Sequence, residues 1–214
     1  MPKTRGRDVA AGGVAGGKTV AAQRDAWICC EDEAGQTLRP PKVRTWGRRG
    51  ETPQIPVSGK GSGRVSIAGL ACYKPGQRPR LIYRTITHRG RKNERRSFGE
   101  RDCISLLDAT HQQLHGPIVL VWDNLNTHIS AAMRQMIAAR DWLTVIRLPA
   151  YAPDLNPTEQ VWSHLKRSIG ILAVRGVDHL LAIIRNRLKR IQYRPDLLDG
   201  FLTHTGLTLL SHWP

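Results

Sequence analysis

The strongest constraint on the fold is a continuous apolar run, Ile118–Trp122, which ends at an acidic residue, Asp123. Apolar residues in succession, without polar alternation, are typical of a strand buried on both faces of a sheet. Such a strand requires helices on either side of the sheet, which predicts an α/β fold. Because open α/β sheets bind ligands beyond the carboxyl ends of their strands, Asp123 lies where a functional site is expected.

Further elements follow from the spacing of the apolar residues and from the turn residues between them. Three early segments have β-type composition, which predicts mostly antiparallel strands at 26–30, 64–73 and 80–87. Helical spacing predicts helices at 98–115, 130–140, 157–169 and 177–191, and one more strand is expected at 143–148. The predicted order is three strands, then alternating helices and strands, then a C-terminal helix.

The segment 1–24 is rich in Gly and Ala and has no apolar periodicity, which indicates a flexible lead-in. Within it, Gly12–Thr19 satisfies the P-loop pattern G-x-x-x-x-G-K-[ST], in which backbone amides cradle phosphates. A P-loop must join a buried strand to a helix, however, and residues 1–11 contain no apolar run. A nucleotide hydrolase is therefore an alternative that the local context disfavours.

The charge of the chain indicates its partner. Lys and Arg number 33 against 17 Asp and Glu, a formal net charge of +16, which favours binding to a polyanion such as nucleic acid. Basic residues cluster at 39–49, at 78–101 and on the predicted C-terminal helix, although some of them are expected only to solvate a surface. No apolar stretch reaches the roughly 20 residues of a membrane span. We therefore expect a cytoplasmic, nucleoid-associated protein with no membrane partner.

Three acidic residues have the placement that metal-dependent phosphoryl transfer needs. Two-metal chemistry requires several carboxylates around a pair of hard cations. Asp32 and Asp123 follow apolar strands, and Glu159 lies in the first turn of a helix that Asn156 caps and Pro157 begins. If the two strands are neighbours, the loop before that helix can deliver Glu159 to the same edge of the sheet.

Each acid also has a purely structural interpretation. An acidic cluster such as 31–33 at a strand end is usually a solvated turn, and Asp123 suits the start of a loop. Glu159 stands where a capping-box glutamate would bind the backbone N–H of Asn156. Spacing alone leaves both interpretations open.

Longer strings resemble a known family. The segments Val121–His128, Leu148–Glu159 and Val161–Lys166 resemble the second half of the Asp-Asp-Glu transposases. More narrowly they are similar to the bacterial insertion-sequence branch of the mariner superfamily, the group usually called IS six-thirty. Glu31–Gly35 and Arg44–Gly50 are similar to the family's first catalytic aspartate and to the Trp-Gly segment after it. The resemblance covers about residues 26–170, and the string Leu-Pro-x-Tyr-x-Pro-x-Leu-Asn-Pro-x-Glu is its most specific part.

The resemblance implies a ribonuclease H-like mixed sheet, which we assign to residues 25–175. Residues 176–214 are expected to form a C-terminal basic helix, predicted from its apolar spacing, and a tail. The resemblance also implies that Asp32, Asp123 and Glu159 are the catalytic residues and the ligands of two Mg²⁺ or Mn²⁺ ions. The implied reaction is cleavage of double-stranded DNA at the ends of an insertion sequence, followed by transfer of the 3′-hydroxyl into target DNA.

The same resemblance suggests which residues surround the reaction. Those expected near the metals or the DNA, or as stabilisers of the turn, are Asn124, Asn126, His128 and Asn156. Contacts to the DNA backbone are expected from basic residues of the clusters, namely Arg44, Arg48, Arg49, Lys166, Arg167, Arg185, Arg187 and Arg194.

One departure from the family pattern concerns DNA recognition. The family places helix-turn-helix modules ahead of the catalytic part, and residues 1–24 leave no room for them. The chain is then expected to be either a truncated remnant or the downstream half of a frameshift product, and in the second case a helix-turn-helix segment from an upstream reading frame is an expected partner. A homodimer on DNA is also expected. Two alternatives stay open: a catalytically silent DNA-binding remnant, and another ribonuclease H-like nuclease such as a junction resolvase.

Overall fold

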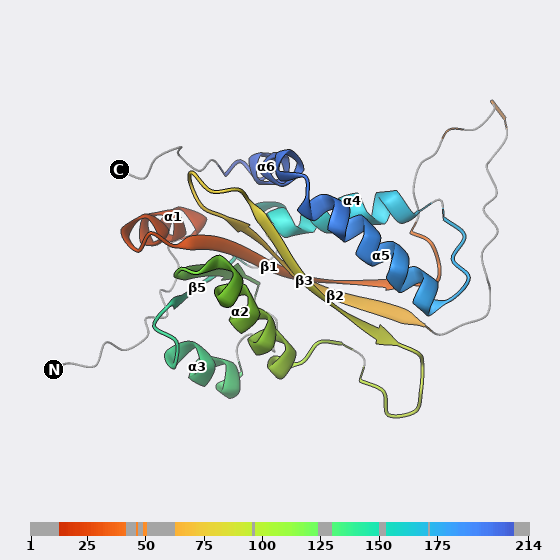
Figure 1. The fold of residues 1–214 in the computed structure, drawn as a ribbon, viewed down its shortest axis with the longest axis horizontal. Coiled ribbons are helices and arrows are strands. Elements are labelled where there is room, and N and C mark those ends of the chain that lie inside the picture. Colours follow the sequence, from red (N-terminus) through yellow and green to blue (C-terminus); the bar gives the residue numbers. More distant parts are fainter. Residues whose placement is uncertain are drawn as a thin grey trace.

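The computed structural model describes residues 13–41, 46, 49–50, 63–95, 97–123, 130–149, 153–170 and 172–207. Its centre is a twisted five-stranded sheet with the order β3-β2-β1-β4-β5, and helices cover both faces (Figure 1). The antiparallel strands are β1 (Trp27–Thr37), β2 (Arg64–Tyr73) and β3 (Arg80–His88). Parallel to β1 lie β4 (Ile118–Trp122) and then β5 (Leu143–Arg147). The predicted mixed sheet and its order of elements are confirmed.

Helices from the middle of the chain cover one face of the sheet, and helices from both ends cover the other. On the first face lie α2 (Glu100–Leu114) and α3 (Ala131–Ala138). On the second face lie α1 (Gly13–Gln23), α4 (Pro157–Ile169), α5 (Val177–Gln192) and α6 (Pro195–His204), with a short 3-10 turn, η1 (Pro153–Leu155), before α4. None of the described helices combines the length and the apolar character needed to cross a bilayer.

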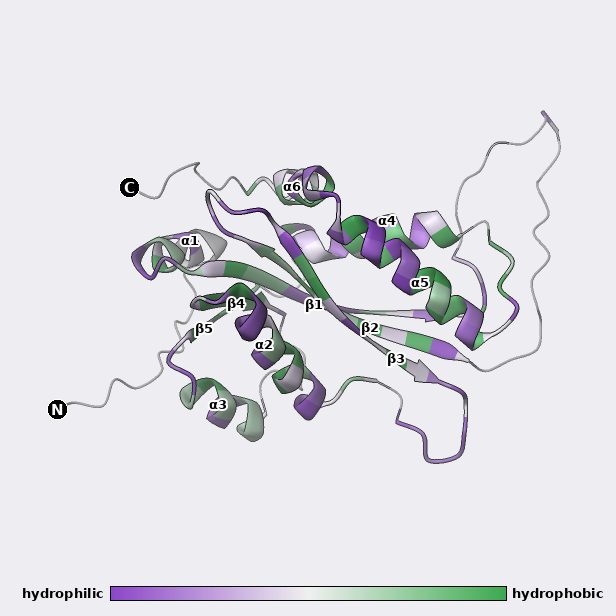
Figure 2. Ribbon diagram, viewed as in Figure 1, coloured by the Kyte–Doolittle hydropathy of each residue, from purple (hydrophilic) through white to green (hydrophobic). Residues whose placement is uncertain are grey.

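Two large apolar clusters hold these layers together. The side chains of α2 and α3 pack with Leu120 and Trp122 of β4 on one face, and α4, α5 and α6 share a second cluster with Val65 and Ile67 of β2. Figure 2 shows hydrophobic and hydrophilic residues on the same ribbon in α2, α4 and α5, as amphipathic packing requires. The four cysteines are buried free thiols.

One prediction about the first part of the chain is wrong. Residues 13–23 form α1 rather than a flexible lead-in, and Ala21 of this helix is fully buried against β1 and β4. Gly17 permits this packing, because a Cβ there would lie 2.7 Å from Ile146 Cδ1. Since residues 13–19 are helical, they do not form the loop that a P-loop requires. The preceding residues, including Gly12, lie outside the described part.

The first strand is longer than predicted. The acidic residues at 31–33 do not form a turn, because β1 continues to Thr37 and pairs with β2 along its length. Asp32 therefore lies within a strand, opposite Gly69 of β2. The helix α6 was not predicted, although Pro195 stands at its first position.

Candidate active site

Asp32 and Asp123 lie beside each other on neighbouring parallel strands. The pairing of β1 with β4 ends at Cys30 and Val121, and Asp123 follows the last residue of β4. Continuing this register by two residues brings Asp32 level with Asp123. Side chains alternate along a strand, so Asp32 shares the face of Cys30, which is the face that α1 and α4 cover. The prediction that the two strands are neighbours is confirmed.

Glu159 reaches this edge of the sheet through the first turn of α4. Asn156 caps the helix, because its Oδ1 accepts the backbone N–H of Thr158 at 3.0 Å, and Pro157 occupies the first turn. The backbone N–H of Asn156 donates to the Pro153 carbonyl at 2.9 Å. That N–H is the group a capping-box glutamate would bind, so Glu159 is not needed for capping.

The start of α4 is bonded directly to the backbone of the sheet. Asn156 Nδ2 donates to the Glu31 carbonyl at 2.9 Å, and the Thr158 hydroxyl donates to the Cys30 carbonyl at 2.6 Å. The same hydroxyl accepts the backbone N–H of Ala71 from β2 at 3.3 Å. Both side chains are buried. The first turn of α4 is thereby fixed one and two residues before Asp32 in β1.

Trp162, one turn further along α4, covers the sheet next to Asp32. A Cβ at Gly69 would lie 2.9 Å from Trp162 Cη2, so only glycine leaves room for the indole at this position. Because Gly69 pairs with Asp32, the indole lies beside the Asp32 carboxyl group. The indole N–H lowers the pKa of Asp32, although it lies outside normal hydrogen-bond geometry.

The surroundings of Asp32 disfavour its charge. Burial raises the pKa of this carboxyl group to about 8, and the charges of Glu159 and Asp123 contribute to the increase, against a backbone N–H bond from Glu33. Its Oδ2 atom is buried and has no hydrogen-bond partner within the described residues. Asp123, just after β4, and Glu159 in α4 are thus close enough to Asp32 in β1 for their charges to act on it.

Sequence reasoning assigned no role to the acids on either side of Asp32. Glu31 is buried, and desolvation followed by the charges of Asp32, Glu33 and Asp123 raises its pKa well above the usual range. Burial and then the charge of Asp123 also raise the pKa of Glu33. Alternation directs both side chains to the opposite face of the sheet, towards α2. The strand pattern around the acids was the signal that could have revealed their burial.

The donor set suits a hard divalent cation. Carboxylate oxygens are the ligands that Mg²⁺ and Mn²⁺ prefer, and a cation would offset the repulsion that the three acids impose on one another. The unpartnered Asp32 Oδ2 is an acceptor that such an ion would satisfy. Across the described ranges, no three His, Cys, Asp or Glu side chains are yet gathered closely enough to hold an ion. The chemistry of the residues fits a metal site, and metal binding would require the three carboxylate groups to move closer together.

The other residues singled out by the resemblance are dispersed. Asn124, Asn126, His128, Arg44 and Arg48 lie outside the described residues. Among the rest, Asn156 lies at the site. Arg49, Lys166 and Arg167 are exposed, and none of them is adjacent in sequence to Asp32, Asp123 or Glu159. On the C-terminal helices, Arg185 is exposed, Arg187 is half-buried and Arg194 pairs with Asp196 at 2.6 Å.

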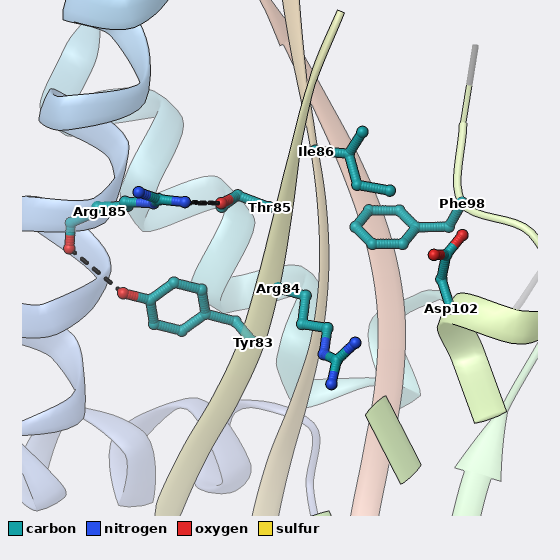
Figure 3. Close-up of a pocket in the computed structure, with 7 residues that line it drawn as sticks. All are labelled: Tyr83, Arg84, Thr85, Ile86, Phe98, Asp102 and Arg185. Atoms are coloured by element: carbon teal, nitrogen blue, oxygen red, sulfur yellow. Dashed lines mark hydrogen bonds between the residues drawn. The ribbon is translucent and has the colours of Figure 1, made fainter. Parts of the chain in front are cut away.

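A shallow hollow of about 350 Å³ lies at the edge strand β3. Figure 3 shows Tyr83, Thr85 and Arg185 on one side of the strand, and Arg84 with Phe98 and Asp102 on the other. Arg185 donates to Thr85 Oγ1 and Arg84 donates to the Ser105 carbonyl, so both guanidinium groups bond to neutral acceptors. Arg84 belongs to the basic cluster at 78–101 but was not singled out from it.

Comparisons with known proteins identify the family and a similar fold. A family model described as DDE superfamily endonuclease matches residues 27–171, whereas curated protein sequences gave no significant match. The fold is similar to the mariner Mos1 paired-end complex with Mg, at a TM-score of 0.57 and 12% identity, covering 98% of this chain and 67% of that chain. The corresponding complex with Mn gives 0.55 and 12%, with the same coverage. The Mos1 catalytic domain gives 0.51 and 13%, covering 91% and 93%. The predicted ribonuclease H-like fold class is confirmed.

We predict that Asp32→Asn stabilises the metal-free protein. A carboxyl group whose folded pKa is about 8 keeps its proton long after the unfolded chain has lost it, near pH 4. Wild-type stability should therefore fall between pH 4 and 8, whereas the Asn variant lacks this loss. We would measure the free energy of unfolding by urea titration, with a chelator present, at pH 5 and pH 8. At pH 8 the Asp32→Asn variant should be more stable than the wild type by about 1–3 kcal/mol.

The matched control is Asp108→Asn, because Asp108 pairs with Arg140 at 2.7 Å. This substitution should leave the protein equally or less stable at both pH values. Equal stability of the Asp32→Asn variant and the wild type at pH 8 would contradict the assigned burial cost.

Proposed function

We propose, because this chain belongs to the DDE superfamily of endonucleases, that it is the catalytic domain of a metal-dependent DNA transposase. In this proposal Asp32, Asp123 and Glu159 are the catalytic residues and hold the cations. The observation that carries it is the buried carboxyl group of Asp32, whose pKa responds to both other acids. We take residues 25–175 as the catalytic domain and 176–214 as a C-terminal extension, whose helices α5 and α6 share a core with α4.

The cofactor we propose is a pair of Mg²⁺ or Mn²⁺ ions. The similar Mos1 structures include one complex with Mg and one with Mn, which supports divalent metal use. When bound, such ions supply Lewis acidity and charge screening at the phosphate being cleaved. The chain contributes position: Asp32 is fixed by the paired strand β1, and Glu159 by the bonded first turn of α4. Trp162 packs over Gly69, the partner of Asp32 in β2.

The proposed substrate is double-stranded DNA at the ends of an insertion sequence. Cleavage there would be followed by joining of the 3′-hydroxyl to target DNA. One similar Mos1 structure is described as a paired-end complex with the left transposon end, and another as a strand transfer complex. We further propose the bacterial insertion-sequence branch, a homodimer on DNA, and end recognition by a helix-turn-helix segment from an upstream frame. The protein would then act at the nucleoid.

We expect the exposed basic groups at β3 to contact the DNA backbone. Arg84 and Arg185 flank the edge strand and, among the described residues, neither forms an ion pair with a carboxylate. Tyr83 pairs with Gly69, which pairs with Asp32, so the edge lies two strand spacings, roughly 10 Å, from the acids. A duplex held at the acids could therefore reach this edge.

We predict that Glu159→Gln abolishes Mn²⁺-dependent nicking of DNA while duplex binding stays intact or tightens. The substitution removes a negative charge but little volume, so it should lower the nicking rate by at least a hundredfold without unfolding the chain. Gel assays of nicking and binding measure both effects. Unchanged nicking would place the third ligand elsewhere, with Asp154 the next candidate. Intact DNA binding by a wild-type chain that never nicks DNA would support the silent-remnant alternative.

We also predict a steep salt dependence of duplex binding. Each neutralised phosphate contributes about 0.9 to the slope of log K against log salt, so a slope near −5 or steeper is expected for the wild type. Replacing Arg84 and Arg185 together by Gln should make the slope shallower by roughly 1.8. The control is Lys74→Gln combined with Asp25→Asn, an ion pair outside the basic clusters, which keeps the net charge constant and should leave the slope unchanged. An equal change in both double variants would show that β3 has no special role.

A further inference from the structure

The pairing of β1 with β4 stops before β1 does, and among the described residues Glu31 is the first position of β1 without a strand partner on that side. The ladder between these strands ends at Cys30 and Val121, whereas β1 itself continues to Thr37. Asn156 occupies this position, since its Nδ2 donates to the Glu31 carbonyl at 2.9 Å. The side chain of a residue 125 positions later in the chain thus bonds β1 where β4 ends.

Thr158 forms a second bond next to the first. Its hydroxyl donates to the Cys30 carbonyl at 2.6 Å and accepts the Ala71 N–H at 3.3 Å, so it links α4 to two strands. Thr158 is fully buried and Asn156 is 4% exposed. Buried groups with several partners have little freedom, so these bonds define both the position and the rotation of the first helical turn.

The next residue on that turn is Glu159, and Asp32 directly follows the two bonded positions of β1. The relative placement of these acids is therefore set by Asn156 and Thr158, which carry no charge themselves. Groups that orient metal ligands typically change metal affinity by about 10- to 100-fold when removed.

We propose that Asn156 and Thr158 are positioning residues that fix Glu159 against Asp32 by bonding the first turn of α4 to the backbone of β1. This inference rests on the proposed metal site and goes beyond it, because it assigns the geometry of that site to two uncharged side chains. Asn156 has two separate tasks, since its Oδ1 caps α4 and its Nδ2 binds β1.

The test uses variants that separate these tasks. Thr158→Val keeps the shape of the side chain but removes both hydroxyl bonds, whereas Thr158→Ser keeps the hydroxyl. Asn156→Ser still caps the helix but cannot reach the Glu31 carbonyl. Leu188 lies on the buried face of α5, and Leu188→Ala destabilises the fold away from the site. This variant controls for loss of stability alone.

The readouts are Mn²⁺ affinity without DNA, from the electron paramagnetic resonance signal of free Mn²⁺, and the free energy of unfolding from urea titration. We expect Thr158→Val and Asn156→Ser to weaken Mn²⁺ binding about tenfold or more while they are fully folded. Thr158→Ser and Leu188→Ala should stay within about threefold of the wild type, although Leu188→Ala is less stable.

Three outcomes overturn the inference, and they are distinguishable. If Thr158→Val and Asn156→Ser bind Mn²⁺ like the wild type, while Asp32→Asn and Glu159→Gln do not, the metal site stands and the positioning role is wrong. If the wild type itself binds no more Mn²⁺ than the Asp32→Asn variant, both the proposed metal site and the positioning role are wrong. If Leu188→Ala loses as much Mn²⁺ affinity as Thr158→Val, the effect is explained by lower stability alone, and the positioning role is wrong.

Discussion

The candidate site depends on the hydrogen bonds between the first turn of α4 and the backbone of β1. They form where β4 stops pairing with β1, so a helix start replaces a strand as the partner of the sheet. These contacts join residues more than 120 positions apart, and they can form only when the start of α4 packs on the sheet. The acids therefore meet because of the tertiary fold and not because of any local segment.

This arrangement places several acidic side chains in a poorly solvated strand, which lowers the stability of the fold. Burial raises the pKa values of Glu31, Asp32 and Glu33, and each neighbouring carboxylate adds to the effect. The two apolar clusters around the sheet must supply the stability that these groups remove. Functional sites commonly break the rules that the rest of a fold obeys. A bound cation would offset part of the repulsion, which links the stability of this region to the function we propose.

Local signals predicted some elements well and others poorly. The bounds of α4 followed from the Asn156 cap and Pro157, and the buried strand β4 followed from its apolar run. The extent of β1 did not follow, because its acidic residues suggest a turn and only pairing with the apolar strand β2 keeps them extended. For α1, small residues such as Gly17 hid a helix that is stabilised by close packing. The bonds of Thr158 could not be predicted, because nothing in the sequence places its hydroxyl between Cys30 and Ala71.

The central claim is that α4 brings Glu159 to the same cations as Asp32 and Asp123. Crystals of the protein grown with Mn²⁺ test it most directly, because anomalous scattering locates manganese independently of the protein coordinates. We expect anomalous peaks within bonding distance of carboxylate oxygens of all three residues, with the bonds from Asn156 and Thr158 to β1 intact. Manganese bound by Asp32 and Asp123 while Glu159 points elsewhere, or no peak at these residues at saturating Mn²⁺, would contradict it.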